Sequence, residues 1–489
     1  MKKLLLLFVP LVFFFSCEEE NNDDSNECLL YGLWYVGYMT NYSADDTHCY
    51  CEYISSICND NIDACPYIYF ENGSFSGLDG DGDELAGDLT SVGALGDVVV
   101  LSGKITEDTK LTANYKYLLR GGVFVELGAT LEIEAGTTIY GEGASNGTLI
   151  ISKGGKIEAN GTASKPIIMT CDQAPGSRAR GQWGGLIVNG SAPINVGAEA
   201  FGEGDTGSYG GTNPADSSGT LKYVRIEFAG IEFSPDNELN GIAFQGVGSG
   251  TVVDYVQVHF NQDDGIEFFG GTVNAKHLVC SGIRDDSFDW TYGWTGKGQY
   301  WIAQQRGDDA DQGFEIDNNS KNNEATPRSD AQIYNVTLVG DPKGKESDIG
   351  MLVREGAAGT YKNIIAMGFR KTGLRIDGDV SQRMAAEGKT IIQNCIFFGN
   401  TSEGAEKQFH SDFEKNMALD AANSNRVVDP ELGAPYDLTA PNFTPAAGSP
   451  ALTGAATPPS DGFFDKTNFV GAMGAGDNWI AGWTNFAQN

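Results

Sequence analysis

Carboxylates are concentrated in three short segments of the sequence, and the segments lie about one repeat apart. Residues 263–267 read Asp-Asp-Gly-Ile-Glu, residues 285–289 read Asp-Asp-Ser-Phe-Asp, and residues 308–317 hold five further acidic side chains. Three or four carboxylate oxygens brought together form the kind of ligand set that calcium takes. Carboxyl groups held in pairs could also serve as a general acid and a general base. Either chemistry requires the three segments to lie side by side in the fold.

A repeated pattern of short strands would bring the three segments together. One series of four-residue segments begins at Gly241, Gly265, Ser287, Gly313, Gly350 and Gly373, with 22 to 37 residues between starts. A second series lies between them, at residues 256–258, 278–280, 336–338, 364–366 and 395–397. In both series apolar residues alternate with variable ones, which predicts strands with one buried face. A repeat of this length built from several small strands predicts a solenoid.

Three acidic residues occupy the same position in consecutive coils of this solenoid. Because Ile266 and Phe268 must point inward, Glu267 is expected to point outward, with Asp289 and Glu315 at the matching positions of the next two coils. Carboxylates stacked about 4.8 Å apart repel one another unless a cation, a basic side chain or proton uptake relieves them. We therefore consider a calcium site at these three residues. The alternative is a solvated acidic face that is neutralised in part by arginines.

Aromatic and basic residues follow the acidic segments. The aromatic residues are Trp290, Tyr292, Trp294, Tyr300 and Trp301, and the basic residues are Arg284 and Arg306. Solenoid interiors are narrow, so we expect some of these rings on the outside, where flat rings bind sugars by stacking. Trp290, Tyr292, Trp294, Tyr300, Arg284 and Arg306 are the candidate ligand-binding residues. The alternative is that Trp290 and Trp301, which are in core register, fill a wide coil.

Asparagines precede three strands of the second series, at Asn335, Asn363 and Asn394. Identical turn residues that recur once per coil can stack into a ladder, in which each amide bonds the next coil. We interpret these asparagines as structural.

Several longer segments resemble a known family. Residues 131–139 and 155–162 look like early coils of right-handed parallel β-helix proteins, as does Gln182-Trp183-Gly184-Gly185-Leu186-Ile187-Val188-Asn189. Residues 445–451 are similar to the segment that ends many such helices. Over about residues 95–480 the chain resembles the β-helix surface lipoproteins of Bacteroidota. The resemblance implies an all-β, right-handed parallel β-helix of the pectate-lyase-like kind, and it implies no particular activity.

The first residues predict export and anchoring. Met1-Lys2-Lys3 is followed by an apolar run to Phe15 and by Ser16-Cys17, a pattern typical of a secretory signal that is too short to span a membrane. Phe14-Phe15-Ser16-Cys17 resembles the lipobox of bacterial lipoproteins, although Phe14 stands where Leu is usual, and the acidic run after Cys17 resembles a surface-export signal. We expect lipidation of Cys17, anchoring in the outer membrane and exposure at the cell surface.

The expected domain organisation follows from these features. Residues 1–16 are the signal peptide, 17–27 an acidic tether, 28–94 a cysteine-rich module with an acidic linker, and 95–489 a parallel β-helix with a C-terminal cap. Cys28, Cys49, Cys51, Cys58 and Cys65 crowd the module, which outside the inner membrane favours disulfides over a metal site. Asp79–Asp83 is interpreted as a solvated linker, with a calcium loop as the alternative.

The charge of the chain excludes one class of partner. The formal net charge is −34, which makes nucleic acid an unlikely ligand and suits divalent cations or a basic partner. The leading hypothesis is a surface lipoprotein that binds an extracellular glycan, with calcium as a potential cofactor and an outer-membrane transporter as a potential partner. The alternatives are a polysaccharide lyase or glycoside hydrolase on the same scaffold, and a structural or adhesive protein. Neither Gly-His-Gly nor Arg-Ile-Lys is present, which favours binding over catalysis.

Overall fold

The computed structural model describes residues 88–234 and 237–489. Cys17, the cysteine cluster at residues 28–65 and the Asp79–Asp83 linker lie outside the described residues, so lipidation, disulfides and a linker calcium loop stay predictions. None of the described helices is long and apolar enough to cross a membrane.

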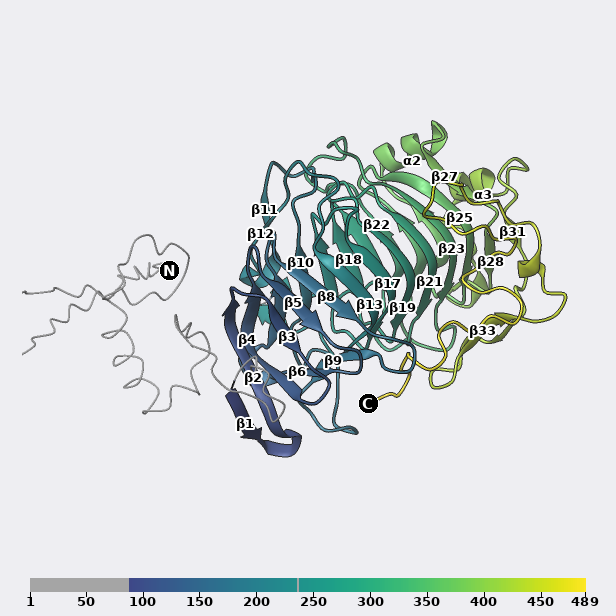
Figure 1. The fold of residues 1–489 in the computed structure, drawn as a ribbon. Helices are drawn as coiled ribbons and strands as arrows, with labels where there is room; N and C mark the ends of the chain where they lie inside the picture. Colours follow the sequence, from purple (N-terminus) through teal and green to yellow (C-terminus); the bar gives the residue numbers. More distant parts are fainter. Residues whose placement is uncertain (1–87, 235–236) are drawn as a thin grey trace, which may run out of the picture. The chain divides into compact units, whose positions relative to one another are not determined.

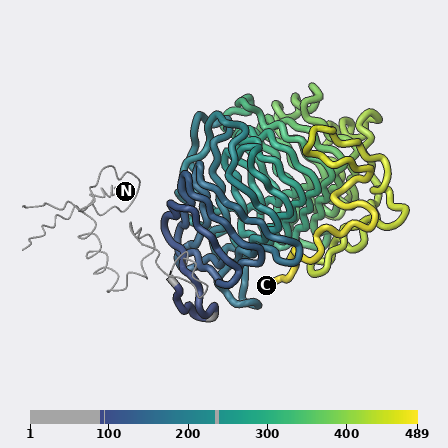
Figure 2. The backbone as a smooth tube through the Cα atoms, in the orientation of Figure 1, coloured from purple at the N-terminus to yellow at the C-terminus, as the bar shows by residue number. Residues whose placement is uncertain are grey.

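The described residues form the predicted parallel β-helix. Twenty-five strands join in one continuous sheet system, and nearly every pairing in it is parallel and joins one coil to the next. Figure 1 and Figure 2 show the coils stacked side by side. The predicted first series is confirmed, because its consecutive members pair in register. All members of the second series are strands in register as well, but residues 301–303, which the prediction omitted, form one more coil between residues 278–280 and 336–338. The fold is therefore an all-β, right-handed parallel β-helix, as the sequence predicted.

Each coil contributes strands to three faces. The first face consists of β7 (Thr148–Ile151), β10 (Gly185–Asn189), β16 (Ile242–Gln245), β18 (Ile266–Phe269), β20 (Phe288–Thr291), β22 (Gln312–Ile316), β24 (Ile349–Val353) and β26 (Thr372–Ile376). The second face includes β3 (Thr109–Leu111), β5 (Thr130–Ile133), β8 (Lys156–Asn160) and β27 (Thr390–Gln393). The third face includes β6 (Thr138–Gly141), β9 (Ile167–Cys171), β28 (Ile396–Phe398) and β31 (Arg426–Val427).

Long strands bend from one face into the next. The strands shared by the second and third faces are β13 (Gly219–Glu227), β17 (Val252–His259), β19 (Asn274–Ser281), β21 (Lys297–Gln304), β23 (Asp330–Val339) and β25 (Ala358–Met367). The strands shared by the third and first faces are β2 (Gly96–Ile105), which pairs antiparallel with β1 (Asp88–Val92), and β4 (Lys116–Val125).

The bend between the second and third faces is made by one residue per coil. In seven consecutive coils this corner residue has a positive φ of 49° to 63°, in the left-handed region that few residue types tolerate. The corner residues are Tyr223, Tyr255, His277, Tyr300, Asn335, Asn363 and Asn394. Asparagine adopts this conformation readily, which explains the three asparagines found in the sequence. They are structural, but each Nδ2 donates to a backbone carbonyl of the C-terminal segment, residues 453–489, and not to another of the three asparagines, which corrects the predicted ladder.

Two insertions cover the outward side of the first face. Residues 190–218 contain the hairpin of β11 (Ala200–Phe201) and β12 (Ser208–Tyr209), and residues 228–241 contain β14 (Glu232–Ser234) and β15 (Asn237–Glu238). Ile194, Tyr209 and Leu239 from these insertions form a small apolar cluster on outward residues of the face. The insertions therefore bury part of a surface that the strand pattern alone would leave open.

The remaining elements lie toward the C-terminal end. They are α2 (Asp379–Ala386), α3 (Asp412–Ala418), β29 (Thr401–Ser402), β30 (Ala405–Glu406), β32 (Leu432–Ala434) and β33 (Asn442–Pro445). Short 3-10 turns occur at η2 (Gly93–Leu95), η3 (Gly143–Ser145), η4 (Glu203–Asp205) and η5 (Pro450–Leu452). After η5 the chain turns back across the third face, where Trp483 and Asn485 bond Arg225 and Gln257, and Gln488 near the C-terminus bonds Arg306.

Candidate functional site

The predicted acidic column exists on the first face. Glu267 of β18 is the register partner of Asp289 of β20, which in turn is the partner of Glu315 of β22. The alternation of inward and outward residues places all three side chains on the outward side of the sheet. Sequence pattern and structure agree on this column.

The column is not solvated, which corrects the expectation that its members face water. The exposed fraction of the residue is only 7% for Glu267 and 9% for both Asp289 and Glu315. The insertion at residues 228–241 contributes to this burial, because Asn240 Nδ2 donates a hydrogen bond to Glu267 Oε2 at 2.6 Å. A merely solvated acidic face is therefore excluded for these three residues.

Of the three groups of neighbouring carboxylates among the described residues, one is buried throughout: Asp264, Glu267 and Asp289. One carboxylate oxygen from each lies within 4.8 Å of the other two, and all three residues are buried. Calcium binds oxygens at 2.3–2.6 Å, so ligands on opposite sides of the ion are about 4.6–5.2 Å apart. The spacing of the three oxygens fits such an ion.

Two buried oxygens at this group lack hydrogen-bond partners. Asp289 Oδ1 and Asn240 Oδ1 are both buried without a partner. A buried acceptor that is left unsatisfied costs about 1–3 kcal/mol, more if it is charged. Carboxylate and amide oxygens are also the ligands that calcium prefers. The donor set Asp264, Glu267, Asp289 and Asn240 therefore fits a divalent cation, and we call it the carboxylate site.

One arginine, Arg354, neutralises one end of the acidic column and leaves the other end without a basic partner. Arg354 Nε donates to Asp317 Oδ1 at 2.9 Å, and the same guanidinium forms an ion pair with Glu315. Among the described residues, no ion pair reaches Asp264, Glu267 or Asp289. The predicted third ligand, Glu315, therefore has an internal cation of its own, whereas the carboxylate site has none.

The pKa values of these groups reflect their burial. Burial raises the pKa of Asp289 well above its ordinary value, and the charges of Glu267 and Glu315 raise that pKa further. Burial and the charge of Asp264 raise the pKa of Glu267 in the same way. The pKa of Glu315 is raised to about 8, mainly by burial and by Asp317, with Arg354 opposing the shift. Burial and mutual repulsion thus favour the uptake of protons or of a cation by the carboxylate site.

Asp264 and Asp286 also join neighbouring coils. Asp264 Oδ1 accepts the backbone N–H of Asp286 at 3.0 Å, and Asp286 Oδ1 accepts the backbone N–H of Gln312 at 2.5 Å. The second aspartate of the first two Asp-Asp pairs thus connects its turn to the next one. Asp264 serves both the turn and the carboxylate site.

Trp290 and Trp294 are not on the surface, which corrects their assignment as ligand-binding rings. Both are fully buried inside the solenoid, as is Trp301. Glycines create the space they need, because a Cβ on Gly298 would lie 2.5 Å from the Trp301 ring and one on Gly296 would lie 2.5 Å from Trp294 Nε1. The alternative interpretation, that these rings fill a wide coil, is confirmed for Trp290 and Trp301.

The remaining candidate aromatics lie at different places. Tyr292 follows the first face, is half-buried, and has its ring 6.1 Å from that of Phe269; its pKa is raised by burial and then by the charge of Glu267. It is therefore close to the carboxylate site. Tyr300 belongs to the corner column, where it stacks on His277 at 4.8 Å, and does not join the acidic column.

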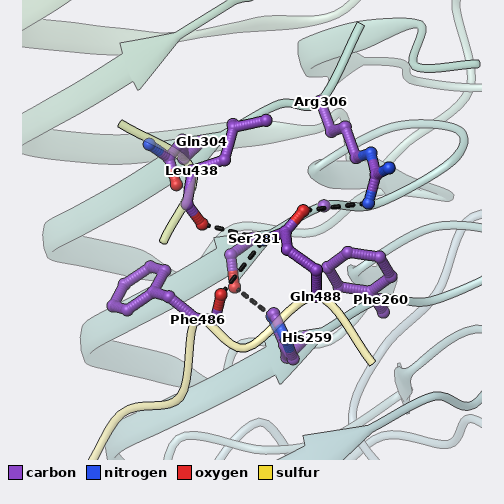
Figure 3. A pocket seen from close by; sticks show the side chains of 9 residues that line it. His259, Phe260, Ser281, Gln304, Arg306, Leu438, Phe486 and Gln488 are labelled. Carbon is purple, nitrogen blue, oxygen red and sulfur yellow. Dashed lines mark hydrogen bonds between the residues drawn. The ribbon is translucent and has the colours of Figure 1, made fainter. Parts of the chain in front are cut away.

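The two candidate arginines lie along the turns that lead into the first face. Arg284 forms an ion pair with Asp309, and Arg306 Nε lies 3.2 Å from Asp308 Oδ2. Arg306 also borders a shallow recess, where its Nη1 donates to Gln488 Oε1 at 2.9 Å (Figure 3). In the same recess His259 Nδ1 lies 2.8 Å from Ser281 Oγ, and burial lowers the pKa of His259 to about 4. Phe486 and Gln488 of the C-terminal segment form one wall of this recess.

Sequence reasoning missed two contributors to the site. Asn240 comes from an insertion, which has no repeat pattern that would assign it a position. Arg354 follows β24, and no sequence pattern identified it as the partner of Glu315. Asp264 was noted among the acidic segments, but only residues within the strands were selected as metal ligands.

Comparison with known proteins agrees with the fold. Residues 103–434 match the family described as pectate-lyase like beta helix domain. This match covers more than half of the chain, so the protein belongs to that family. Searches of curated proteins and of solved structures each gave no match.

Proposed function

We propose that this protein is a surface lipoprotein that binds an extracellular glycan beside the carboxylate site, with calcium as its cofactor. The proposal rests mainly on one observation, the buried group of Asp264, Glu267 and Asp289 with an unpartnered oxygen and no ion pair among the described residues. Membership in a pectate-lyase-like β-helix family supports a carbohydrate-related role. Export and anchoring through Cys17 rest on the sequence, and delivery of the ligand to an outer-membrane transporter rests on analogy.

One ring close to the carboxylate site and one exposed ring on the insertion that covers the first face support a glycan as the ligand. Phe201 of β11 is 80% exposed, and Tyr292 is half-buried. Phe201 precedes Glu203 by two residues, and the charge of Glu203 contributes to the raised pKa of Glu267. Exposed flat rings of this kind stack on sugars. Phe201 and Tyr292 thus take the place of the buried Trp290 and Trp294 in the proposal.

Gel retardation with a panel of polysaccharides tests the proposal. We expect retardation by at least one polysaccharide in calcium and its loss in chelator. Glu267→Gln should weaken the calcium-dependent retardation. Glu107→Gln, which changes an exposed carboxylate, should leave it unchanged. Phe201→Ala should weaken retardation without changing the melting temperature, and Leu127→Ala, at another highly exposed apolar residue, is the matched control. Absence of retardation by every polysaccharide would refute a glycan-binding function.

A polysaccharide lyase or hydrolase is the second candidate. Glu267 and Asp289 share a hydrogen bond and both have raised pKa values, a combination that is found in acid–base pairs. Their burial favours binding over catalysis, because a substrate has little access to either carboxyl group. New reducing ends or unsaturated products during incubation with the same polysaccharides would establish the enzyme. If no polysaccharide retards the protein and the protein cleaves none of them, a structural or adhesive role would remain.

A further inference from the structure

The two insertions over the first face meet directly beside the carboxylate site. A Cβ on Gly204 of the first insertion, residues 190–218, would lie 3.0 Å from Leu239 Cδ2 and 3.6 Å from the ring of Phe233, both of the second insertion. Leu239 is buried in the small apolar cluster that the insertions form on the face. The next residue, Asn240, donates the hydrogen bond to Glu267. One short series of contacts therefore joins the tip of the first insertion to the carboxylate site.

Negative charges gather along this series of contacts. Glu203 precedes Gly204, and Glu238 precedes Leu239, so each insertion brings one carboxylate to the place where the two meet. Burial raises the pKa of Asp263 to about 7, with contributions from the charges of both glutamates. Glu238 is also the register partner of Glu232, and like charges directly opposite each other on two strands are destabilising. Repulsion therefore opposes the contact between the insertions.

A cation at the carboxylate site would reverse this balance. Asn240 Oδ1 and Asp289 Oδ1 are buried without a partner, and both belong to the donor set that fits the ion. An ion bound there takes Asn240 as a ligand and fixes the end of the second insertion on the first face. Its positive charge also offsets the repulsion among the nearby carboxylates. Loading of the site thus favours contact between the two insertions.

Only the tip of the first insertion depends on this contact. The base of the same insertion is anchored separately, because Asn195 Nδ2 donates to Asn318 Oδ1 at 2.9 Å and Ser191 Oγ donates to Asp216 Oδ1 at 2.8 Å. The tip, residues 200–209, contains Phe201, which is 80% exposed and precedes Glu203 by two residues.

We propose that calcium at the carboxylate site holds the two insertions together and thereby positions the ring of Phe201 for the ligand. The ion is buried and needs no contact with the ligand, because its effect reaches the ring through Asn240, Leu239 and Gly204. This inference rests on the proposed function, and it explains how a buried ion controls binding at an exposed ring.

Hydrogen–deuterium exchange of the full chain, in calcium and in chelator and without any glycan, tests this coupling. We expect exchange at residues 200–209 and 237–241 to slow by roughly tenfold in calcium, because the contact between the insertions then opens less often. Residues 190–196, at the anchored base of the first insertion, should exchange equally in both conditions. Asp289→Asn should abolish the response of both segments.

Two variants separate the contact from the ion. Leu239→Ala removes the contact and leaves the ligands of the ion in place, so it should keep the calcium shift in melting temperature while residues 200–209 no longer respond. Glu203→Gln combined with Glu238→Gln removes the repulsion, so exchange at both segments should be slow even in chelator. Asp205→Asn, which removes an exposed charge from the same 3-10 turn, is the matched control and should behave as the wild type.

The outcomes distinguish this inference from the carboxylate site on which it depends. A calcium shift in melting temperature without any change of exchange at residues 200–209 would overturn the inference and leave the site standing. Equal exchange responses in wild type and Leu239→Ala would also overturn it, because the effect would not pass through the contact between the insertions. Absence of both the melting shift and the exchange response would refute the carboxylate site, and this inference with it.

Discussion

Replacing Asp289 by Asn should remove most of the stabilisation that calcium gives to the fold. Asn has nearly the same shape as Asp, so the buried position stays filled while one negative charge disappears. Asp289 is a central member of the carboxylate site, with Asp264 and Glu267 within 4.8 Å. The variant therefore affects cation binding directly and leaves the core of the solenoid unchanged.

Asp289→Asn is expected to change the free energy of unfolding in opposite directions with and without calcium. Two carboxylates within 4.8 Å of each other repel by about 3.5 kcal/mol or more at an effective dielectric constant of about 20 when both are ionised, and proton uptake lowers this cost. Without calcium the variant should therefore be at least as stable as the wild type. Calcium at about 100 times its dissociation constant stabilises the wild type by about 2.7 kcal/mol. For roughly 400 residues that unfold together, this corresponds to about 3 °C in melting temperature.

Thermal melting of both proteins in calcium and in chelator measures these effects. We expect a calcium shift of about 3 °C for the wild type and less than about 1 °C for Asp289→Asn. Glu107→Gln, which changes an exposed carboxylate, should keep the wild-type shift. Equal calcium shifts in wild type and Asp289→Asn would refute the carboxylate site. Any calcium site would then lie elsewhere, for example in the Asp79–Asp83 linker.

Three further predictions concern the same fold. Arg354→Gln should lower the free energy of unfolding in urea by about 3 kcal/mol, because Glu315 loses its partner, and should increase the number of calcium ions bound in calorimetry. The pKa values of Asp311 and Glu315 are raised to about 7 and about 8, so the folded state binds more protons than the unfolded state between about pH 4 and pH 8. Stability in chelator should therefore fall as pH rises through this range, and a urea midpoint that is higher at pH 8 than at pH 5 would contradict this. Gly298→Ala should destabilise the fold by about 1–3 kcal/mol through overpacking against Trp301, with an unchanged calcium shift in melting experiments.

The sequence predicted the coils because their signal is local. The glycine that begins many first-face strands, such as Gly265, allows close approach, since a Cβ there would lie 2.5 Å from the carbonyl oxygen of Ser287. Alternation of apolar and variable residues after that glycine then determines which side chains point inward. The register of Glu267, Asp289 and Glu315 followed from these two signals alone.

The environment of the column could not be predicted in the same way. Burial of Glu267 depends on Asn240, which lies in an insertion without any repeat. The buried position of Trp294 depends on Gly296, whose importance is visible only when the ring is in place. Partners that come from outside the repeat determine whether an outward residue meets water, an amide or a guanidinium, and the repeat carries no information about them.

The C-terminal segment joins coils that do not touch one another. Corner residues of successive coils share one backbone conformation, and each coil of the solenoid pairs only with its two neighbours. The segment, however, bonds Asn394 near its start and Gln257 near its end, so a single piece of chain contacts coils that are far apart in the stack. Opening of one coil therefore breaks contacts that also hold others. A repeat fold stabilised only by contacts between neighbouring coils thereby gains a contact that favours its unfolding as one unit.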